Sequence, residues 1–179
     1  MKRRTAIRNV IFLSAGATFL PSCLQQDKNT AASIALKNIQ VNGTQEKLLA
    51  ELSEFILPTT TTPGAKQLAS QQFVLMMVDE CFKKEEQEKF VKGLQDFDAF
   101  AKKQSGETFS DADAAKRTSL LKAIESRKDI PEEILEFYGA AKRLTIQSFT
   151  GSKYFLTEVR KYDMVPGRFH GCFPVSSKA

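Results

Sequence analysis

The chain has 179 residues, a formal net charge of +5 and three cysteines, and it contains 14 phenylalanines but no tryptophan. Four basic residues and no acid lie in residues 1–22, so the remaining chain carries a net charge of only +1. The charge therefore gives no indication that the body of the protein binds nucleic acid. Residues 44–179 are long enough for one modest domain with a single core.

Residues 1–22 have the pattern of an export signal. Residues 1–8 are basic, and the apolar run 10–20 is shorter than the ~20 residues that a membrane-spanning helix needs. Arg3 and Arg4 form a twin-arginine element, which predicts export of a folded protein. Ala6 stands where a large apolar residue is more usual after such a pair, so the route for unfolded chains is the alternative.

A lipid attachment site follows the apolar run. Leu20-Pro21-Ser22-Cys23 resembles a bacterial lipobox, in which Cys23 becomes the lipidated first residue of the mature protein. An ordinary signal with an incidental cysteine is the alternative. Residues 23–43 then form the lipidated cysteine and a polar tether. We expect an exported protein that lipid anchors to a membrane on the periplasmic side, or to the outer membrane.

The body of the chain predicts an all-α fold, a compact bundle of about six helices with an irregular C-terminal tail packed on it. Apolar residues recur at helical spacing and breakers separate the segments. The second helix contains the apolar run 73–78, which places it centrally in the bundle with Met76 and Met77 in the core. The expected helices span residues 44–57, 66–82, 85–103, 111–126, 131–150 and 152–162.

Local signals indicate how these segments begin and pack. Ser110 and Asp113 form a capping box ahead of the fourth helix, which turns Ala114, Leu121 and Ile124 inward. Pro131 fits the first turn of the fifth helix. The four threonines of residues 59–62 belong to a solvated loop, because no P-loop lysine follows Gly64.

The tail, residues 162–174, combines breakers with residues that are usually buried. Two glycines and two prolines exclude a regular helix or a central strand. Tyr162, Phe169, Cys172 and Phe173 nevertheless need a surface to cover them. That surface belongs to the protein's own domain, to a partner, or to a groove between the two.

No set of residues predicts catalysis or metal binding. Asp79 and Glu80 are adjacent carboxylates that point about 100° apart on a helix, so we place them on its surface. A single histidine, His170, falls short of a zinc site. Cys81 and Cys172 are candidates for a disulfide in an oxidising compartment, with a bridge to a partner or two free thiols as alternatives.

Four stretches together resemble the gluconate 2-dehydrogenase small-subunit (subunit three) family, and the resemblance covers about residues 46–175. They are Ile56-Leu-Pro58 with Thr62-Pro-Gly-Ala65, Leu144-Thr-Ile-Gln147, Ser152-x-Tyr154, and the last stretch, Tyr162-x-x-Val165-Pro-Gly-Arg168 with Gly171-Cys-x-Pro174. Thr61 departs from the family pattern, in which an acidic residue is commoner.

The resemblance implies a non-catalytic accessory subunit of a membrane-associated flavin-dependent sugar or alcohol dehydrogenase. Its partner would be a large flavoprotein of the glucose-methanol-choline type that holds FAD, often with a cytochrome c, and this chain would stabilise that subunit and aid its export. A free-standing helical lipoprotein and an independent enzyme are the alternatives. The residues expected to face the partner are Tyr162, Val165, Pro166, Gly167, Arg168, Phe169, Gly171, Phe173 and Pro174.

Overall fold

The computed structural model describes residues 31–160, 162 and 167, and over these residues the predicted all-α fold is confirmed. No strand forms among them, and Ala31 and Asn42 make an isolated antiparallel bridge. The elements are the α-helices α2 (Gly43–Ile56), α3 (Ser70–Cys81), α4 (Lys84–Ser105), α5 (Ala114–Ser126) and α6 (Glu132–Thr150), followed by the π-helix η2 (Phe155–Val159).

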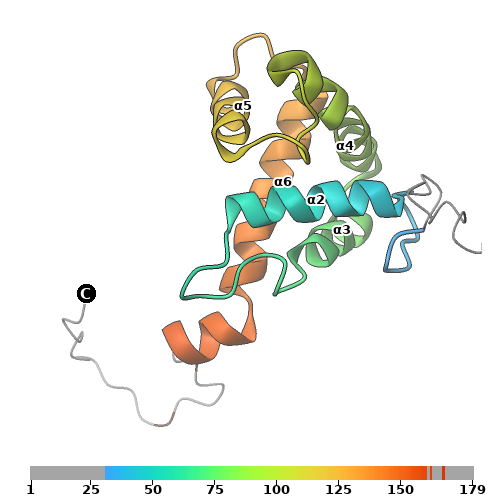
Figure 1. The fold of residues 1–179 in the computed structure, drawn as a ribbon. Coiled ribbons are helices and arrows are strands. Elements are labelled where there is room, and N and C mark those ends of the chain that lie inside the picture. Colours follow the sequence, from blue (N-terminus) through green and yellow to red (C-terminus); the bar gives the residue numbers. More distant parts are fainter. Residues whose placement is uncertain (1–30, 161, 163–166, 168–179) are drawn as a thin grey trace, which may run out of the picture.

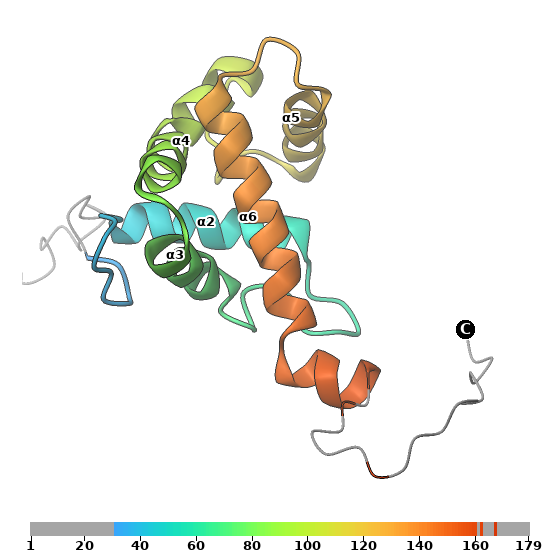
Figure 2. The same cartoon turned by 180° about the vertical axis from the view of Figure 1, so that it is seen from behind.

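Helix α6 is the centre of the bundle and contacts every other described helix. It runs through the molecule from top to bottom in Figure 1, with α4 and α5 beside its upper half and α2 crossing its middle. Figure 2 shows the same arrangement from behind. Its buried side includes Phe137, Ala141 and Leu144, none of which is exposed.

The prediction that the second helix is central and buries its methionines is wrong for Met76. Helix α3 buries one side, through Val74, Leu75 and Val78, while Met76 remains 53% exposed and Met77 is partly buried. An apolar run shows that a helix has a core face, but it does not show how many of its sides other helices cover.

Phenylalanine supplies the bulk of the core. Four phenylalanines are the largest fully buried side chains among the described residues. Phe90, Phe97 and Phe137 join across the contact between α4 and α6, with ring centroids 5.2 Å and 5.3 Å apart in edge-to-face geometry. Phe109 enters from the loop between α4 and α5, 5.4 Å from Phe97. Such contacts add ~0.5–1.5 kcal/mol each beyond the burial of area.

The predicted start of α5 lies one turn too early. Asp113 itself is the N-cap residue, and its carboxylate accepts a hydrogen bond of 2.7 Å from the backbone N–H of Lys116. The capping box of Ser110 is therefore not formed; the Ser110 carbonyl accepts from Arg117 instead. With the helix beginning at Ala114, that residue is exposed, and Leu120 joins Leu121 and Ile124 in the core.

Residues 31–42 pack on the bundle, whereas the sequence placed them in the tether. We call this segment the strap. Ile39 is 6% exposed, and Ile34, Leu36 and Val41 pack against the core. The folded body therefore includes residues 31–42, ahead of the first predicted helix. Most of the predicted tail lies outside the described residues.

Candidate partner interface

The loop between α2 and α3 is organised by one carboxylate. Glu54 accepts hydrogen bonds from the backbone N–H of Thr59 at 2.9 Å, from the Thr59 hydroxyl at 2.8 Å and from the backbone N–H of Lys66 at 2.8 Å. Burial acts to raise the pKa of Glu54, but these hydrogen bonds outweigh it and lower that pKa below its ordinary value. The four threonines are thus part of a loop with a defined shape.

Gly64 lets this loop close. A Cβ atom at Gly64 would lie 2.5 Å from the backbone nitrogen of Thr59 and 2.8 Å from the Glu54 carboxylate. Any larger residue would therefore displace the backbone that Glu54 holds. The next residue, Ala65, is fully buried, and its N–H donates to the Leu57 carbonyl at 2.9 Å.

Buried hydroxyl groups fix the C-terminal half of α6 against α2 and α3. The Thr145 hydroxyl donates to that of Ser53 at 3.1 Å, and the hydroxyls of Ser70 and Ser148 lie 2.6 Å apart. Ser53, Ser70 and Thr145 have no exposed surface. Because buried hydroxyls need such partners, these contacts specify how the helices meet at this end.

Beyond α6 the chain turns at Gly151 and forms a short C-terminal hook, which we define as residues 152–160 and 162. Phe149 contacts Tyr154 and Phe155, with ring centroids 6.4 Å and 5.5 Å apart. Among the described helices η2 contacts only α6, and none of its residues is buried. The hook lies below the lower end of α6 in both ribbon views (Figures 1 and 2).

Exposed apolar residues gather at this end of the described chain. Ile146 of α6 is 47% exposed, and in the hook Val159 is 54% and Tyr162 is 58% exposed. The fourth large exposed hydrophobic residue of the described ranges, Met76, lies on α3. A contiguous exposed apolar patch is typical of a surface that a partner covers, and these three residues are the candidates for one at this end of the described chain. We call Ile146 together with the hook the candidate interface.

A model of the family described as gluconate 2-dehydrogenase subunit 3 matches residues 43–167, well over half of the chain. The chain belongs to this family. The match confirms the resemblance predicted from the sequence, and it runs from the first residue of α2 past the hook. The comparisons with curated proteins and with solved structures find no match.

Three of the four stretches that carry the resemblance to the gluconate 2-dehydrogenase subunit 3 family lie within the described residues, and the fourth, residues 162–174, lies outside them apart from Tyr162 and Gly167. The stretches at residues 56–58 and 62–65 lie at the end of α2 and in the Glu54 loop, and residues 144–147 lie in the half of α6 that the hydroxyl pairs fix to α2 and α3. Ser152 begins the hook: its hydroxyl donates to the Phe149 carbonyl and accepts from the Phe155 N–H. The described stretches therefore lie towards the end of the bundle that carries the candidate interface, a placement that the sequence alone did not show.

Two of the predicted partner-facing residues are described, and both Tyr162 and Gly167 are exposed. The others, together with Arg3, Arg4, Cys23, His170 and Cys172, lie outside the described residues. Cys81 is exposed at the end of α3, and its pairing with Cys172 stays a prediction. Sequence reasoning missed Ile146 and Val159, because an apolar residue at helical spacing is usually assigned to the core.

The placement of Asp79 on the helix surface is wrong, since only 3% of this residue is exposed. Its carboxylate accepts three backbone hydrogen bonds from the strap, from Lys37 at 2.9 Å, Asn38 at 2.7 Å and Ile39 at 2.9 Å. Its neighbour Glu80 does lie at the surface, where it pairs with the Lys37 ammonium group at 2.8 Å. Asp79 is therefore a structural anchor for the strap.

We expect the strap to loosen in acid. Burial acts to raise the pKa of Asp79, but the strap N–H groups outweigh it and hold that pKa below its ordinary value of 3.8. Because the folded-state pKa is lowered, the stabilisation is fully present above the ordinary pKa and is lost as the pH falls through the lower, folded value. Amide chemical shifts of residues 37–39, followed by NMR from about pH 6 to about pH 2, should titrate together below pH 3.8. An Asp79→Asn variant should lose this transition, and a transition at or above the ordinary pKa would contradict it.

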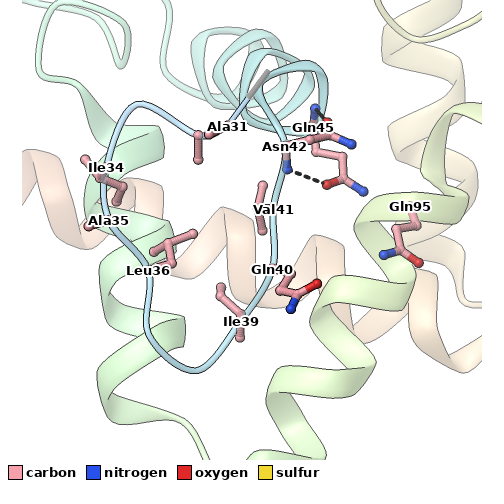
Figure 3. A pocket seen from close by; sticks show the side chains of 11 residues that line it. Ala31, Ile34, Ala35, Leu36, Ile39, Gln40, Val41, Asn42, Gln45 and Gln95 are labelled. Carbon is pink, nitrogen blue, oxygen red and sulfur yellow. Dashed lines mark hydrogen bonds between the residues drawn. The ribbon is translucent and has the colours of Figure 1, made fainter. Parts of the chain in front are cut away.

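The strap also lines an open hollow of about 570 Å³ (Figure 3). Its lining combines apolar side chains of the strap, such as Ile34 and Leu36, with the amides of Gln45 and Gln95. In the described part of the chain, no group of three His, Cys, Asp or Glu residues is placed to hold a metal ion. No helix of these same residues is long and apolar enough to cross a membrane.

Proposed function

We propose that this protein is a non-catalytic accessory subunit of a membrane-associated, flavin-dependent sugar or alcohol dehydrogenase. It binds a large flavoprotein subunit of the glucose-methanol-choline type, stabilises it and aids its export as a folded complex. FAD belongs to that partner, and a cytochrome c takes the electrons onward. The observation that carries the proposal is the family match over residues 43–167.

The geometry of the candidate interface supports a binding role. The hook presents apolar side chains that its own bundle leaves uncovered, since η2 contacts α6 alone among the described helices. A partner that covers Val159 and Tyr162 would remove this apolar surface from water, at about 25 cal/mol for each Å² buried. The hydroxyl pairs fix the half of α6 that carries Ile146 against α2 and α3, which lowers the ordering cost of binding at that residue.

The export elements complete the proposal. The twin-arginine pair Arg3-Arg4 suits a flavoprotein that must fold around its cofactor before it leaves the cytoplasm. Acylation of Cys23 then anchors the complex to a membrane on the periplasmic side. One chain would thus supply both the export signal and the lipid anchor for a larger catalytic subunit.

Purification of the native protein from detergent-solubilised membranes tests the proposal. We expect a larger chain with a flavin absorption spectrum to copurify, and Cys23→Ala to move both chains into the soluble exported fraction or to block processing. Recovery of the chain alone, without flavin, would favour a free-standing lipoprotein instead. Membrane association of Cys23→Ala that survives high-salt washing in the absence of the partner would refute the lipid anchor.

A further inference from the structure

The strap is fastened to the bundle at two separate points. The Asp79 carboxylate of α3 binds the consecutive N–H groups of residues 37–39. At its start, the N–H of Ser33 donates to Glu46 of α2 at 2.6 Å, and the Ser33 hydroxyl bonds the same carboxylate. Both acids are almost fully buried, at 3% exposure for Asp79 and 7% for Glu46. A buried carboxylate that accepts hydrogen bonds from backbone N–H groups holds those groups firmly, because leaving the carboxylate or the N–H groups buried without a partner would cost free energy.

The two ends of the strap meet. Ala31 forms its antiparallel bridge with Asn42, the residue that caps α2. The chain therefore enters the strap close to the point where it leaves it for α2, and residues 32–41 form a closed loop between the two. Figure 3 shows this loop, with Ala31 and Asn42 at one end and Leu36 and Ile39 on its two sides towards the other. If the loop opened, the chain between Cys23 and the bundle would become longer, and it would then join the bundle at the start of α2.

The length of chain released is large compared with what precedes it. From Cys23 to Ala31 there are eight residue steps, which span at most ~29 Å. From Cys23 to Gly43 there are twenty, which span at most ~72 Å. These limits hold for any conformation of the connecting residues.

We infer that the strap is a clasp that shortens the tether: Asp79 and Glu46 store residues 31–42 as a closed loop and so keep the body close to the lipid surface that holds Cys23. Its membrane role rests on the lipid anchor of the proposed function. The strap lies at the end of α2 remote from the hook in both ribbon views, so the short tether leaves the candidate interface free for a partner (Figures 1 and 2).

Distance measurement between two spin labels tests the clasp in the full chain. One label is attached to Cys23 and the other to Lys47→Cys, an exposed position on α2, with Cys81→Ser and Cys172→Ser removing the other thiols. We expect Asp79→Ala combined with Glu46→Ala, which removes both fastenings, to raise the upper limit of the measured distances by somewhat less than the about 2.5-fold ratio of the two chain lengths, because the fixed distance to residue 47 adds to both. Ile39→Ser combined with Glu46→Ala, which keeps Asp79 in place, should act in the same direction. Glu80→Gln is the matched control, because it removes only the exposed ion pair with Lys37, and it should leave the distances unchanged.

Unchanged distances in both double variants, Asp79→Ala with Glu46→Ala and Ile39→Ser with Glu46→Ala, with helix content intact, would overturn the inference. So would a parent protein whose distances already extend as far as those of the Asp79→Ala, Glu46→Ala variant. The measurement is made in solution and does not depend on acylation of Cys23. Failure of the clasp is therefore distinguishable from failure of the lipid anchor, which membrane fractionation of Cys23→Ala reports separately.

Discussion

Replacing Gly93 with alanine is expected to destabilise the fold by ~3 kcal/mol, because this glycine lies where α4 meets α6. A Cβ atom at Gly93 would lie 2.2 Å from the backbone carbonyl oxygen of Glu133 and 2.5 Å from Cβ of Phe137. Neither atom is the free end of a flexible side chain, so the helices themselves would have to separate. Separation would loosen the contacts of Phe137 with Phe90 and Phe97 at the same time.

Gly139→Ala is the matched control for this prediction. Gly139 lies in the middle of α6, and no atom lies within 4 Å of the position that its Cβ would occupy. Alanine there should stabilise the helix by ~0.5–1 kcal/mol, because glycine loses more backbone entropy on folding. Urea unfolding followed by circular dichroism measures both variants. If Gly93→Ala left the free energy of unfolding unchanged, or changed it as Gly139→Ala does, then α4 and α6 would not approach each other closely at this residue.

The helices of this fold were predictable because their apolar residues recur at helical spacing. Phe90, Leu94 and Phe97 of α4 follow one face, and all three are buried. Spacing within a helix carries no information about its neighbours, however. This is why the apolar run of α3 suggested a central helix, while α6 occupies the centre and Met76 remains exposed.

The strap was not predictable from its composition. Residues 31–42 alternate small, polar and apolar residues without a helical or strand period, so they resemble a tether. What fixes them are the carboxylates of Glu46 and Asp79, of which Asp79 lies about forty residues further along the chain. In such a contact the donors are backbone N–H groups, which nearly every residue has, and the acceptor is one of many acidic side chains, so neither is distinctive in the sequence. The sequence therefore contains no local signal for it.

The candidate interface was predictable in part. The stretches that resemble the family indicated which residues matter, and the structure places residues 144–147 and Ser152 at the C-terminal end of α6 and Thr62–Ala65 in the loop between α2 and α3. It could not be deduced that Ile146 and Val159 face solvent. That result depends on where the hook leaves α6, which the turn at Gly151 sets.

The combination of Ile146→Lys with Val159→Lys is expected to weaken binding of the large flavoprotein subunit that we propose as the partner by at least about 100-fold. Buried interface anchors typically contribute ~2 kcal/mol or more each, and a charge placed on each of them would have to be desolvated. Both residues are about half exposed in the isolated chain, at 47% and 54%, so the substitutions remove little from its own core. The free energy of unfolding of this chain alone should change by less than ~0.5 kcal/mol for each substitution.

Met76→Lys separates this explanation from a general loss of apolar surface. Met76 is exposed to the same degree, at 53%, but it lies on α3 outside the candidate interface. We expect it to bind the partner as the parent chain does, measured by titrating the purified large subunit with each variant. An equal loss in Met76→Lys would move the binding surface towards α3. Parent-like binding by the double variant would show that the hook is not covered by the partner, because two lysines cannot enter an apolar contact without cost.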